Sequence, residues 1–263
     1  MTDRVELPLS GASFGADPSF VELLKRQRPE AMPASVQLGA VDVPQATTVL
    51  GLRYAEGIVM AGDRRATSGY TIADAKMKKV FAADDFSAIA IAGAAGQAVE
   101  TVRLFQLELE HYEKLTGDRL SLEGKANRLA QMIRANFPLA VQGLVVVPLF
   151  GGYDEGRNEG RLFYYDATGG RWEEQDYQAT GSGAQPAKNS LKKRWRPGLD
   201  HDEAMRVAVE ALIDAAEDDV ATGGPDLARG IFPVVVTVTA QGATESTDED
   251  VATAVRAVVE TRS

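Results

Sequence analysis

The sequence has the composition of an ordinary globular protein, and it excludes several classes of function. Its 263 residues are 44% hydrophobic and 25% charged, which is enough for a sizeable core. The net charge of −10 argues against nucleic acid or an anionic membrane as a partner. Because the chain has no cysteine, disulfides, thiolate catalysis and cysteine-based metal sites are excluded.

The two histidines and the start of the chain bear on the kinds of site that the protein can have and on its location. His111 and His201 fall in predicted helices among charged residues, so we expect each on a solvated face. We therefore expect no metal site, no histidine triad and no cofactor. The amino terminus has no apolar signal core, and no run of 18 apolar residues occurs anywhere. We expect a cytoplasmic protein.

Residues 1–46 differ from the rest of the chain. They hold five of the eleven prolines, and proline removes a backbone donor and interrupts regular ladders. One short helix is predicted from Pro18 to Arg28, with Asp17 as its cap. This composition favours a removable leader over a folded domain.

The remainder, 47–263, shows a regular succession of periodic segments and no internal linker. In chain order we predict strands at 48–54, 58–61, 79–81 and 87–92, helices at 95–115 and 122–137, strands at 144–150, 162–165 and 172–179, helices at 186–195 and 201–217, a strand at 231–239 and a helix from after Thr247 to near Glu260. Ser121 and Asp200 are the expected caps of two of these helices. Strands and helix pairs in this order indicate an α+β protein, with two sheets face to face and helices outside.

The junction at 44–50 is the most informative stretch. Thr47 and Thr48 open the first strand directly after Ala46. We hypothesise that the bond between Ala46 and Thr47 is cut, which would give Thr47 a free amine beside its hydroxyl. Such an amine has a pKa of about 7.7–8.0 and can act as the base for its own hydroxyl. The alternative is structural, because β-branched residues commonly begin strands.

Three residues could serve such a nucleophile. Asp63 ends the strand expected to pair with that of Thr47, and its carboxylate could hold the ammonium of Lys79. A lysine there would lower the pKa of a new terminal amine by like-charge repulsion. Gly93, at a strand-to-helix turn, could offer its N–H to an oxyanion. Structural alternatives remain: Lys79 belongs to a basic cluster typical of a solvated edge, and Gly93 could be a plain turn glycine.

Several motifs occur together in order and spacing. They are Thr47-Thr48-Val49, the run from Gly57 to Thr67, Lys79-Val80, Ile91-Ala92-Gly93, Gly181-Ser182-Gly183 and the run from Asp219 to Gly224. In this arrangement the chain resembles the catalytic β subunits of the 20S proteasome over essentially all of 47–263. The segments Thr222 to Asp226 and Gly230 to Pro233 are similar to the actinobacterial branch.

The resemblance implies an N-terminal-nucleophile hydrolase with a four-layer αββα sandwich. It implies that Thr47 is the nucleophile of a threonine endopeptidase, exposed by autocatalytic loss of residues 1–46. The other residues that it implicates in catalysis are Asp63, Lys79, Ser182, Asp219, Thr222 and Gly93, with Arg65 in a structural role near Lys79. Position 222 carries threonine where many relatives have serine, which preserves a hydroxyl.

The resemblance also implies how substrate is held. Thr67, Gly93 and Ala95 would bind the substrate backbone as an added strand. The side-chain pocket would be formed by Ala66, Met77, Phe81, Ile91, Ala95 and Val99. Since all of these are apolar, we expect cleavage after apolar or aromatic residues.

The partners follow from the resemblance alone. It implies homo-oligomeric seven-membered β rings that are stacked in pairs and capped by rings of proteasome α subunits. It further implies a ring ATPase that delivers tagged protein substrates to the chamber. No nucleic acid and no membrane are expected.

Three alternatives are weighed. The first is the simpler two-ring bacterial (HslV-like) threonine protease, whose shorter subunits typically carry Gly-Gln after the aspartate, where this chain has Arg64-Arg65. The second is a catalytically silent ring subunit, which would keep its leader. The third is a phosphate cradle at 93–96, which lacks a third glycine and an alternating βαβ context.

Overall fold

The computed structural model describes residues 47–68 and 71–262, and the contacts among its residues separate a unit at 41–263 from residues 1–40. The helix expected at 18–28, the leader and Ala46 lie outside the described residues. Two five-stranded sheets form the centre of the larger unit, and a short pair, β3 (Ala66–Ser68) with β4 (Thr71–Asp74), stands apart from them. Every strand pair among the described residues is antiparallel.

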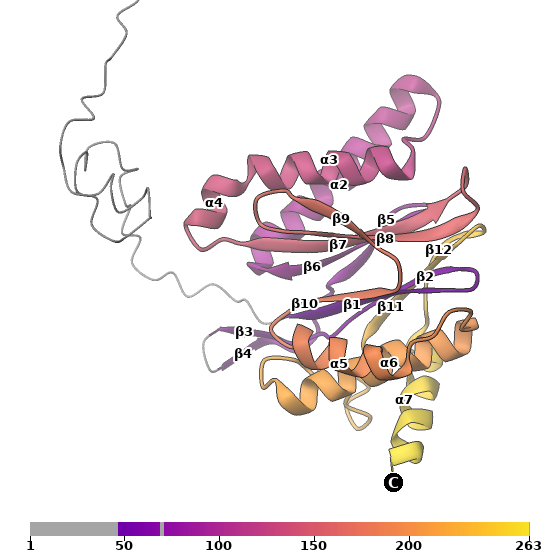
Figure 1. Ribbon diagram of the computed structural model, residues 1–263. Helices are drawn as coiled ribbons and strands as arrows, with labels where there is room; N and C mark the ends of the chain where they lie inside the picture. Colours follow the sequence, from indigo (N-terminus) through magenta and orange to yellow (C-terminus); the bar gives the residue numbers. More distant parts are fainter. Residues whose placement is uncertain (1–46, 69–70, 263) are drawn as a thin grey trace, which may run out of the picture. The chain divides into compact units, whose positions relative to one another are not determined.

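The first sheet has the order β10-β1-β2-β11-β12 and carries the Thr47 junction at one end. Its strands are β1 (Thr48–Tyr54), β2 (Gly57–Gly62), β10 (Tyr177–Gly181), β11 (Val234–Thr239) and β12 (Gly242–Glu245). Helices α5 (Ala184–Arg194), α6 (His201–Asp218) and α7 (Asp248–Arg262) pack on its outer side, with α7 against α6 (Figure 1).

The second sheet has the order β5-β6-β7-β8-β9. Its strands are β5 (Val80–Asp84), β6 (Ser87–Gly93), β7 (Val146–Asp154), β8 (Glu159–Tyr165) and β9 (Arg171–Glu174). Helices α2 (Ala95–Thr116) and α3 (Leu122–Ala135) cover its outer side, and the short α4 (Phe137–Val141) follows α3 (Figure 1).

The alternation of side chains along each strand explains this packing. In β2, Val59 and Ala61 face the α5–α6 core, whereas Ile58 and Met60 face the other sheet. Because successive strand residues point to opposite faces, a strand that is apolar on both faces is covered on both faces. The core between the sheets also contains Val80, Leu149 and Val236, among other residues.

Several predicted elements require correction. The predicted strand 172–179 is two strands, β9 and β10, which lie in different sheets. The predicted strand 231–239 begins at Val234, because Ile231 forms an isolated bridge with Asp226. The predicted helix 122–137 ends at Ala135, and Pro138 lies in the first turn of α4, where proline is tolerated. Strands β3, β4 and β12 were not predicted. Both expected caps are confirmed, with a full capping box at Asp200.

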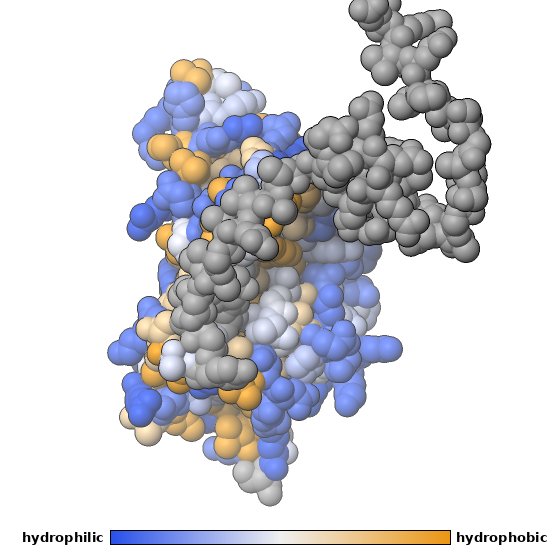
Figure 2. Space-filling model, turned by 90° about the vertical axis from the view of Figure 1, so that its left-hand side faces the viewer, coloured by the Kyte–Doolittle hydropathy of each residue, from blue (hydrophilic) through white to orange (hydrophobic). Residues whose placement is uncertain are grey.

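The surface carries scattered apolar side chains. Exposed large ones include Leu107 and Leu115 on α2, Val141 on α4 and Val220 after α6. Figure 2 shows small hydrophobic areas near the top and the bottom of one face, separated by hydrophilic stretches. None of the described helices combines the length and the apolar character needed to span a bilayer.

Candidate active site

Thr47 lies immediately before β1, at the end of the central strands of the first sheet. Only 4% of it is exposed, and its carbonyl oxygen accepts a hydrogen bond from the Ser182 amide at 2.9 Å. The Thr48 carbonyl accepts from the Asp63 amide at 3.1 Å. Neighbours on both sides, from β10 and from β2, therefore hold the backbone at this junction.

Asp63 and Lys79 form a fully buried ion pair beside this junction. The Lys79 Nζ donates to Asp63 Oδ1 at 2.7 Å, and both side chains are 0% exposed. Lys79 also donates to the Arg65 carbonyl at 2.5 Å. A buried charge is costly unless it is paired and hydrogen-bonded. Both conditions are met here, which explains how the interior accommodates the charge of Lys79.

The Asp63 carboxylate ties this pair to the junction through backbone amides. Its Oδ1 accepts from the Thr48 amide at 2.8 Å, in addition to Lys79. Its Oδ2 accepts from the amides of Arg65 at 2.9 Å and Gly223 at 2.8 Å. One carboxylate thus connects β1, the segment after β2 and the loop after α6. It fixes the ammonium of Lys79 relative to the residue that follows Thr47.

Burial lowers the pKa of Lys79, and the nearby Arg65 charge lowers it further, whereas Asp63 acts in the opposite direction. The net direction is downward, which favours the neutral amine more than in a solvated lysine. Perturbed lysines of this kind occur at sites of proton transfer and also within structural ion pairs.

A chain of hydroxyls runs from Thr48 to Asp219. Thr222 Oγ1 donates to Asp219 Oδ2 at 2.5 Å and lies 2.6 Å from Thr48 Oγ1. Since the one proton of Thr222 goes to the carboxylate, the hydroxyl of Thr48 must donate to Thr222. The Gly183 amide donates to Thr48 Oγ1 at 2.9 Å and completes the chain.

Ser182 joins the same carboxylate. Its Oγ donates to Asp219 Oδ2 at 2.6 Å, next to the amide that contacts Thr47. Burial alone would raise the pKa of Asp219, but hydrogen bonds from Ser182, Thr222 and the Ala221 amide, with the charge of Arg65, outweigh it and lower the pKa. Asp219 is therefore an anion at neutral pH, acting as acceptor for the hydroxyls around Thr47.

Two glycines allow β10 to pass close to the junction. Gly181 has a φ of +107°, and a Cβ there would lie 1.8 Å from the Thr47 carbonyl oxygen. At Gly183 a Cβ would lie 2.6 Å from the hydroxyls of both Thr48 and Thr222. Any side chain would disrupt these contacts, so both positions require glycine.

Gly93 is the last residue of β6. It follows Ile91 by two residues, and the Ile91 amide donates to the carbonyl of Lys79, the lysine of the buried ion pair, at 2.9 Å. The φ of Gly93 is +117°, and a Cβ would lie 2.0 Å from the Val145 carbonyl oxygen. Backbone geometry alone therefore requires glycine here, whatever else its amide does.

The predicted substrate-binding residues fall into two groups. Ala66 and Thr67 lie in β3, directly after Arg65, and the Met77 amide donates to the Arg64 carbonyl at 3.0 Å. The second group lies between β5, β6 and α2, where Ile91 is buried and Phe81 and Val99 pack against the same core. Ala95 is the first residue of α2.

Sequence reasoning missed part of the network. The hydroxyl of Thr48 and the amides of Gly183 and Gly223 were not among the predicted site residues, yet each contacts one of them. The Gly-Ser-Gly and Gly-Gly motifs that carry these amides were visible. His201, expected on a solvated face, has a 43% exposed side chain and lies away from this site. No cluster of three or more metal-binding side chains occurs in the described part of the chain.

Comparison with known proteins assigns this arrangement to a family. A family model described as "Proteasome subunit" matches residues 43–226. The chain belongs to the proteasome subunit family. It is 53% identical to "Proteasome subunit beta" of Streptomyces griseus over 93% of this chain and 88% of the relative. It is 56% identical to the protein of that name from Acidimicrobium ferrooxidans, over 91% of this chain and 88% of the relative.

A third relative, "Proteasome subunit beta" of Acidothermus cellulolyticus, is 53% identical over 93% of this chain and 87% of its own length. The predicted resemblance to actinobacterial proteasome β subunits is thereby confirmed. The chain is a protease subunit of the proteasome core, its enzyme class is that of the threonine proteases, and its fold is the N-terminal-nucleophile hydrolase fold.

These findings bear on the alternatives. The relatives favour a proteasome β subunit over the two-ring protease. The phosphate cradle at 93–96 lacks its expected context, because β6 before helices α2 to α4 and β7 after them are antiparallel neighbours. A parallel βαβ unit would be needed to place a nucleotide at that turn. A catalytically silent subunit would differ from an active one by keeping its leader, which N-terminal sequencing detects.

Proposed function

We propose that Thr47 is the nucleophile of this protease subunit, freed when the bond between Ala46 and Thr47 is cut. One observation carries the proposal: the buried Lys79–Asp63 pair is attached by a hydrogen bond to the Thr48 amide, the residue next to Thr47. In the uncut chain the Thr47 nitrogen belongs to a peptide bond and is not basic. Hydrolysis of that bond consumes one water and leaves a carboxyl on Ala46 and an amine on Thr47.

The proposed reaction then has two halves. The Thr47 hydroxyl oxygen attacks the scissile carbonyl while its proton moves to the Thr47 amine, and an ester forms as the leaving amine takes that proton. Water then hydrolyses the ester, which restores the hydroxyl and releases the second product. The Lys79–Asp63 ion pair fits this scheme, because Asp63 favours the charged form of Lys79, and a cation beside the new terminus keeps part of the Thr47 amine neutral.

The remaining predicted residues have supporting roles in the proposal. Ser182 and Asp219 position the terminal amine and a water, and Thr222 orients the carboxylate of Asp219. Gly93 would offer its amide to the oxyanion that forms on attack. The hydrogen bonds of Ser182 to both Asp219 and the Thr47 carbonyl support this assignment.

Substrate would bind as an added strand along Thr67, Gly93 and Ala95. The pocket for its side chain would be formed by six apolar residues, Ala66, Met77, Phe81, Ile91, Ala95 and Val99. We therefore propose preferential cleavage after apolar or aromatic residues. Faster release of product from peptides ending in Tyr or Leu than from peptides ending in Asp or Lys would support it, and the reverse order would contradict it.

The domain organisation and assembly are part of the same proposal. Residues 1–46 would be a propeptide, and 47–263 would be the catalytic domain, with its two sheets and two helix layers forming a four-layer αββα sandwich. The subunit would assemble into seven-membered rings that contact α-subunit rings, in the cytoplasm, with a ring ATPase supplying tagged protein substrates. The name "Proteasome subunit beta" of the relatives supports this reading.

The decisive experiment compares Thr47→Ala and Thr47→Ser with the wild type, each assembled with a candidate α subunit. We expect Thr47→Ala to assemble, keep residues 1–46 and lose peptidase activity. Thr47→Ser keeps a hydroxyl and should retain cleavage and activity. Full activity of Thr47→Ala would overturn the proposal, and an inactive wild type that keeps its leader would identify a silent subunit.

A further inference from the structure

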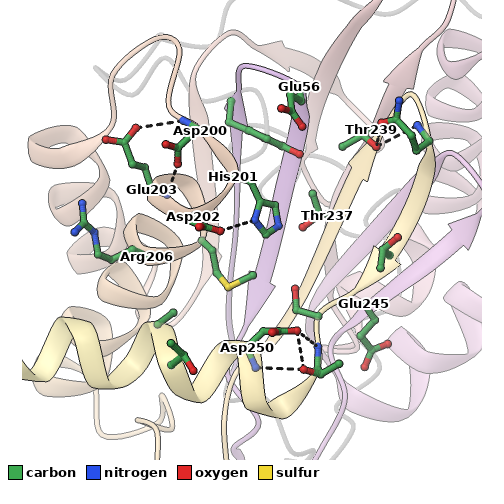
Figure 3. A pocket seen from close by; sticks show the side chains of 18 of the residues that line it. Glu56, Asp200, His201, Asp202, Glu203, Arg206, Thr237, Thr239, Glu245 and Asp250 are labelled. Atoms are coloured by element: carbon green, nitrogen blue, oxygen red, sulfur yellow. Dashed lines mark hydrogen bonds and ion pairs between the residues drawn. The ribbon is translucent and has the colours of Figure 1, made fainter.

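A cavity of about 790 Å³ lies at the other end of β1 from Thr47. It is bounded by the β1–β2 turn, the first turns of α6, the β11–β12 hairpin and α7. Figure 3 shows His201 pointing from α6 toward the strand that carries Thr237. The volume of the cavity is in the range of sites that bind drug-sized ligands. Because β1 runs from Thr48 to Tyr54, roughly 20 Å at about 3.3 Å per residue separates this cavity from the proposed nucleophile.

Two buried hydroxyls in the wall of this cavity lack hydrogen bonds. They belong to Tyr54, which is 8% exposed, and Thr237, which is 7% exposed, and neither has a partner among the described residues. Two other hydroxyls of the wall have partners: Thr239 Oγ1 donates to Gln241 at 2.9 Å, and Thr247 Oγ1 donates to Asp250 at 2.6 Å. Leaving a buried hydroxyl without a partner is unfavourable, so two in one cavity indicate that something else supplies the partners.

The two hydroxyls lie on the same face of the sheet. Tyr54 belongs to the core cluster against α6 and α7, as does Val59. Thr237 pairs with Val59 across the β2–β11 ladder, and cross-strand partners share a face. Both side chains therefore point from the sheet toward the helices, on the side where the cavity opens between them.

The wall of the cavity is acidic. Six carboxylates line it, against one arginine, Arg206, and one histidine, His201; the carboxylates belong to Glu56, Asp200, Asp202, Glu203, Glu245 and Asp250. Asp200 caps α6, Asp250 accepts from the amide and hydroxyl of Thr247 at the start of α7, and Glu245 pairs with Lys78. The carboxylate of Glu56 has no hydrogen bond or ion pair with another described residue, so it is available to a ligand.

Burial and the charge of Glu56 raise the pKa of Tyr54 to about 12, so its hydroxyl stays protonated at neutral pH. A neutral hydroxyl has lone pairs that accept from an ammonium group, and a nearby carboxylate compensates the positive charge. Apolar surface comes from Met205, Ala254 and Ala257.

We propose that this cavity is a binding site for a small organic amine with an apolar body. Its ammonium group donates to the hydroxyls of Tyr54 and Thr237 and is compensated by Glu56. Its apolar part packs against Met205 and Ala254. The site is separate from the proposed peptidase centre, so its test does not depend on peptidase activity.

The test uses three probes of the same shape, 4-phenylbutylamine, 4-phenylbutan-1-ol and 4-phenylbutyrate, titrated into the full-length chain by calorimetry. The amine should bind with a Kd below about 1 mM, which corresponds to a net gain of roughly 4 kcal/mol. The alcohol and the carboxylate should bind at least about ten-fold more weakly. Equal binding of amine and carboxylate, or no binding of the amine, would overturn the proposal.

Variants separate the two hydroxyls from a general apolar effect. Tyr54→Phe and Thr237→Val should each weaken amine binding by roughly three- to ten-fold, as expected for the loss of one hydrogen bond. Thr239→Val is the matched control, because its hydroxyl lines the same cavity but is already bonded to Gln241. It should leave amine affinity unchanged. Unchanged affinity in both hydroxyl variants would refute the assignment.

Stability without ligand gives a second readout. Since Tyr54 and Thr237 lose no protein hydrogen bond, Tyr54→Phe and Thr237→Val should unfold at the wild-type urea concentration or above it. If both variants instead unfold at clearly lower urea, their hydroxyls have protein partners, and the proposal fails. A crystal soaked with 4-phenylbutylamine that shows only ordered water on the two hydroxyls would also contradict it.

Discussion

Replacing Asp63 by asparagine tests whether the buried ion pair is held as described. The substitution keeps the shape of the side chain but removes its charge and two acceptor positions. In the wild type, Oδ1 accepts from Thr48 and Lys79, and Oδ2 accepts from Arg65 and Gly223. Either orientation of the asparagine amide therefore places its NH₂ group against two donors, and no rotation removes the conflict.

The expected magnitude follows from burial. Both side chains of the pair are 0% exposed, so Asp63→Asn leaves an ammonium without a counter-charge in the interior. Removing one partner of a buried pair costs about 3–5 kcal/mol, a large part of the roughly 5–15 kcal/mol that stabilises a typical domain. The matched control is Glu245→Gln, because the neighbouring pair Lys78–Glu245 spans 2.5 Å but its side chains are 41% and 45% exposed. Exposed pairs contribute about 0–1 kcal/mol.

The assay is urea unfolding of the full chain, with Thr47→Ala in every variant so that the chain stays intact. Asp63→Asn should lower the free energy of unfolding by at least about 2 kcal/mol more than Glu245→Gln. Adding Lys79→Met should recover part of the loss, because the uncompensated ammonium is removed. The loss should also shrink as pH rises, since a lysine whose folded-state pKa is lowered destabilises the fold less once it is neutral. Equal effects of Asp63→Asn and Glu245→Gln would refute the reasoning.

Three further predictions concern the surrounding network. Thr222→Val should destabilise the protein by about 1–3 kcal/mol and reduce peptidase activity, because the Thr48 hydroxyl loses its acceptor and Asp219 loses a donor. Thr222→Ser keeps the hydroxyl, so stability and peptidase activity should both stay near those of the wild type in the same assays. Gly93→Ala should lower the urea midpoint, since its φ of +117° alone costs about 1–3 kcal/mol for alanine and the new Cβ overlaps the Val145 carbonyl; a midpoint equal to wild type would contradict this. The pKa of Asp219 is lowered from 3.8, so the stability that its charged form contributes is present above pH 3.8 and is lost as pH falls through the folded-state pKa. The difference in stability between wild type and Asp219→Asn should therefore narrow below about pH 3.8. A difference that widens there would count against this prediction.

The order of elements was largely predictable because alternation and helical periodicity mark buried faces. The segment 172–179 shows where this fails. It reads as one β-rich run, but the chain turns at Gln175-Asp176 and passes from one sheet to the other. Local propensity cannot report which sheet a strand joins, since pairing is decided by partners distant in sequence. The short strands β3, β4 and β12 were missed because three or four residues carry too little periodicity.

The candidate site, too, could be predicted from the sequence only in part. Asp63 could be placed near the Thr47 junction from hairpin geometry, and the structure pairs the same strands, with Val49 opposite Gly62. The residues from distant segments, Ser182, Asp219 and Thr222, were proposed only through the family resemblance. The roles of the Gly183 and Gly223 amides were not foreseen, because a sequence pattern does not give the direction of a backbone N–H.

The most direct test of the account is the amino-terminal sequence and intact mass of the β chain in active particles. The account predicts that every active chain begins at Thr47 and that residues 1–46 are absent, while Thr47→Ala particles keep them. Active particles whose chains begin at any other residue would contradict it, since the nucleophile would then have no amine of its own to accept its proton.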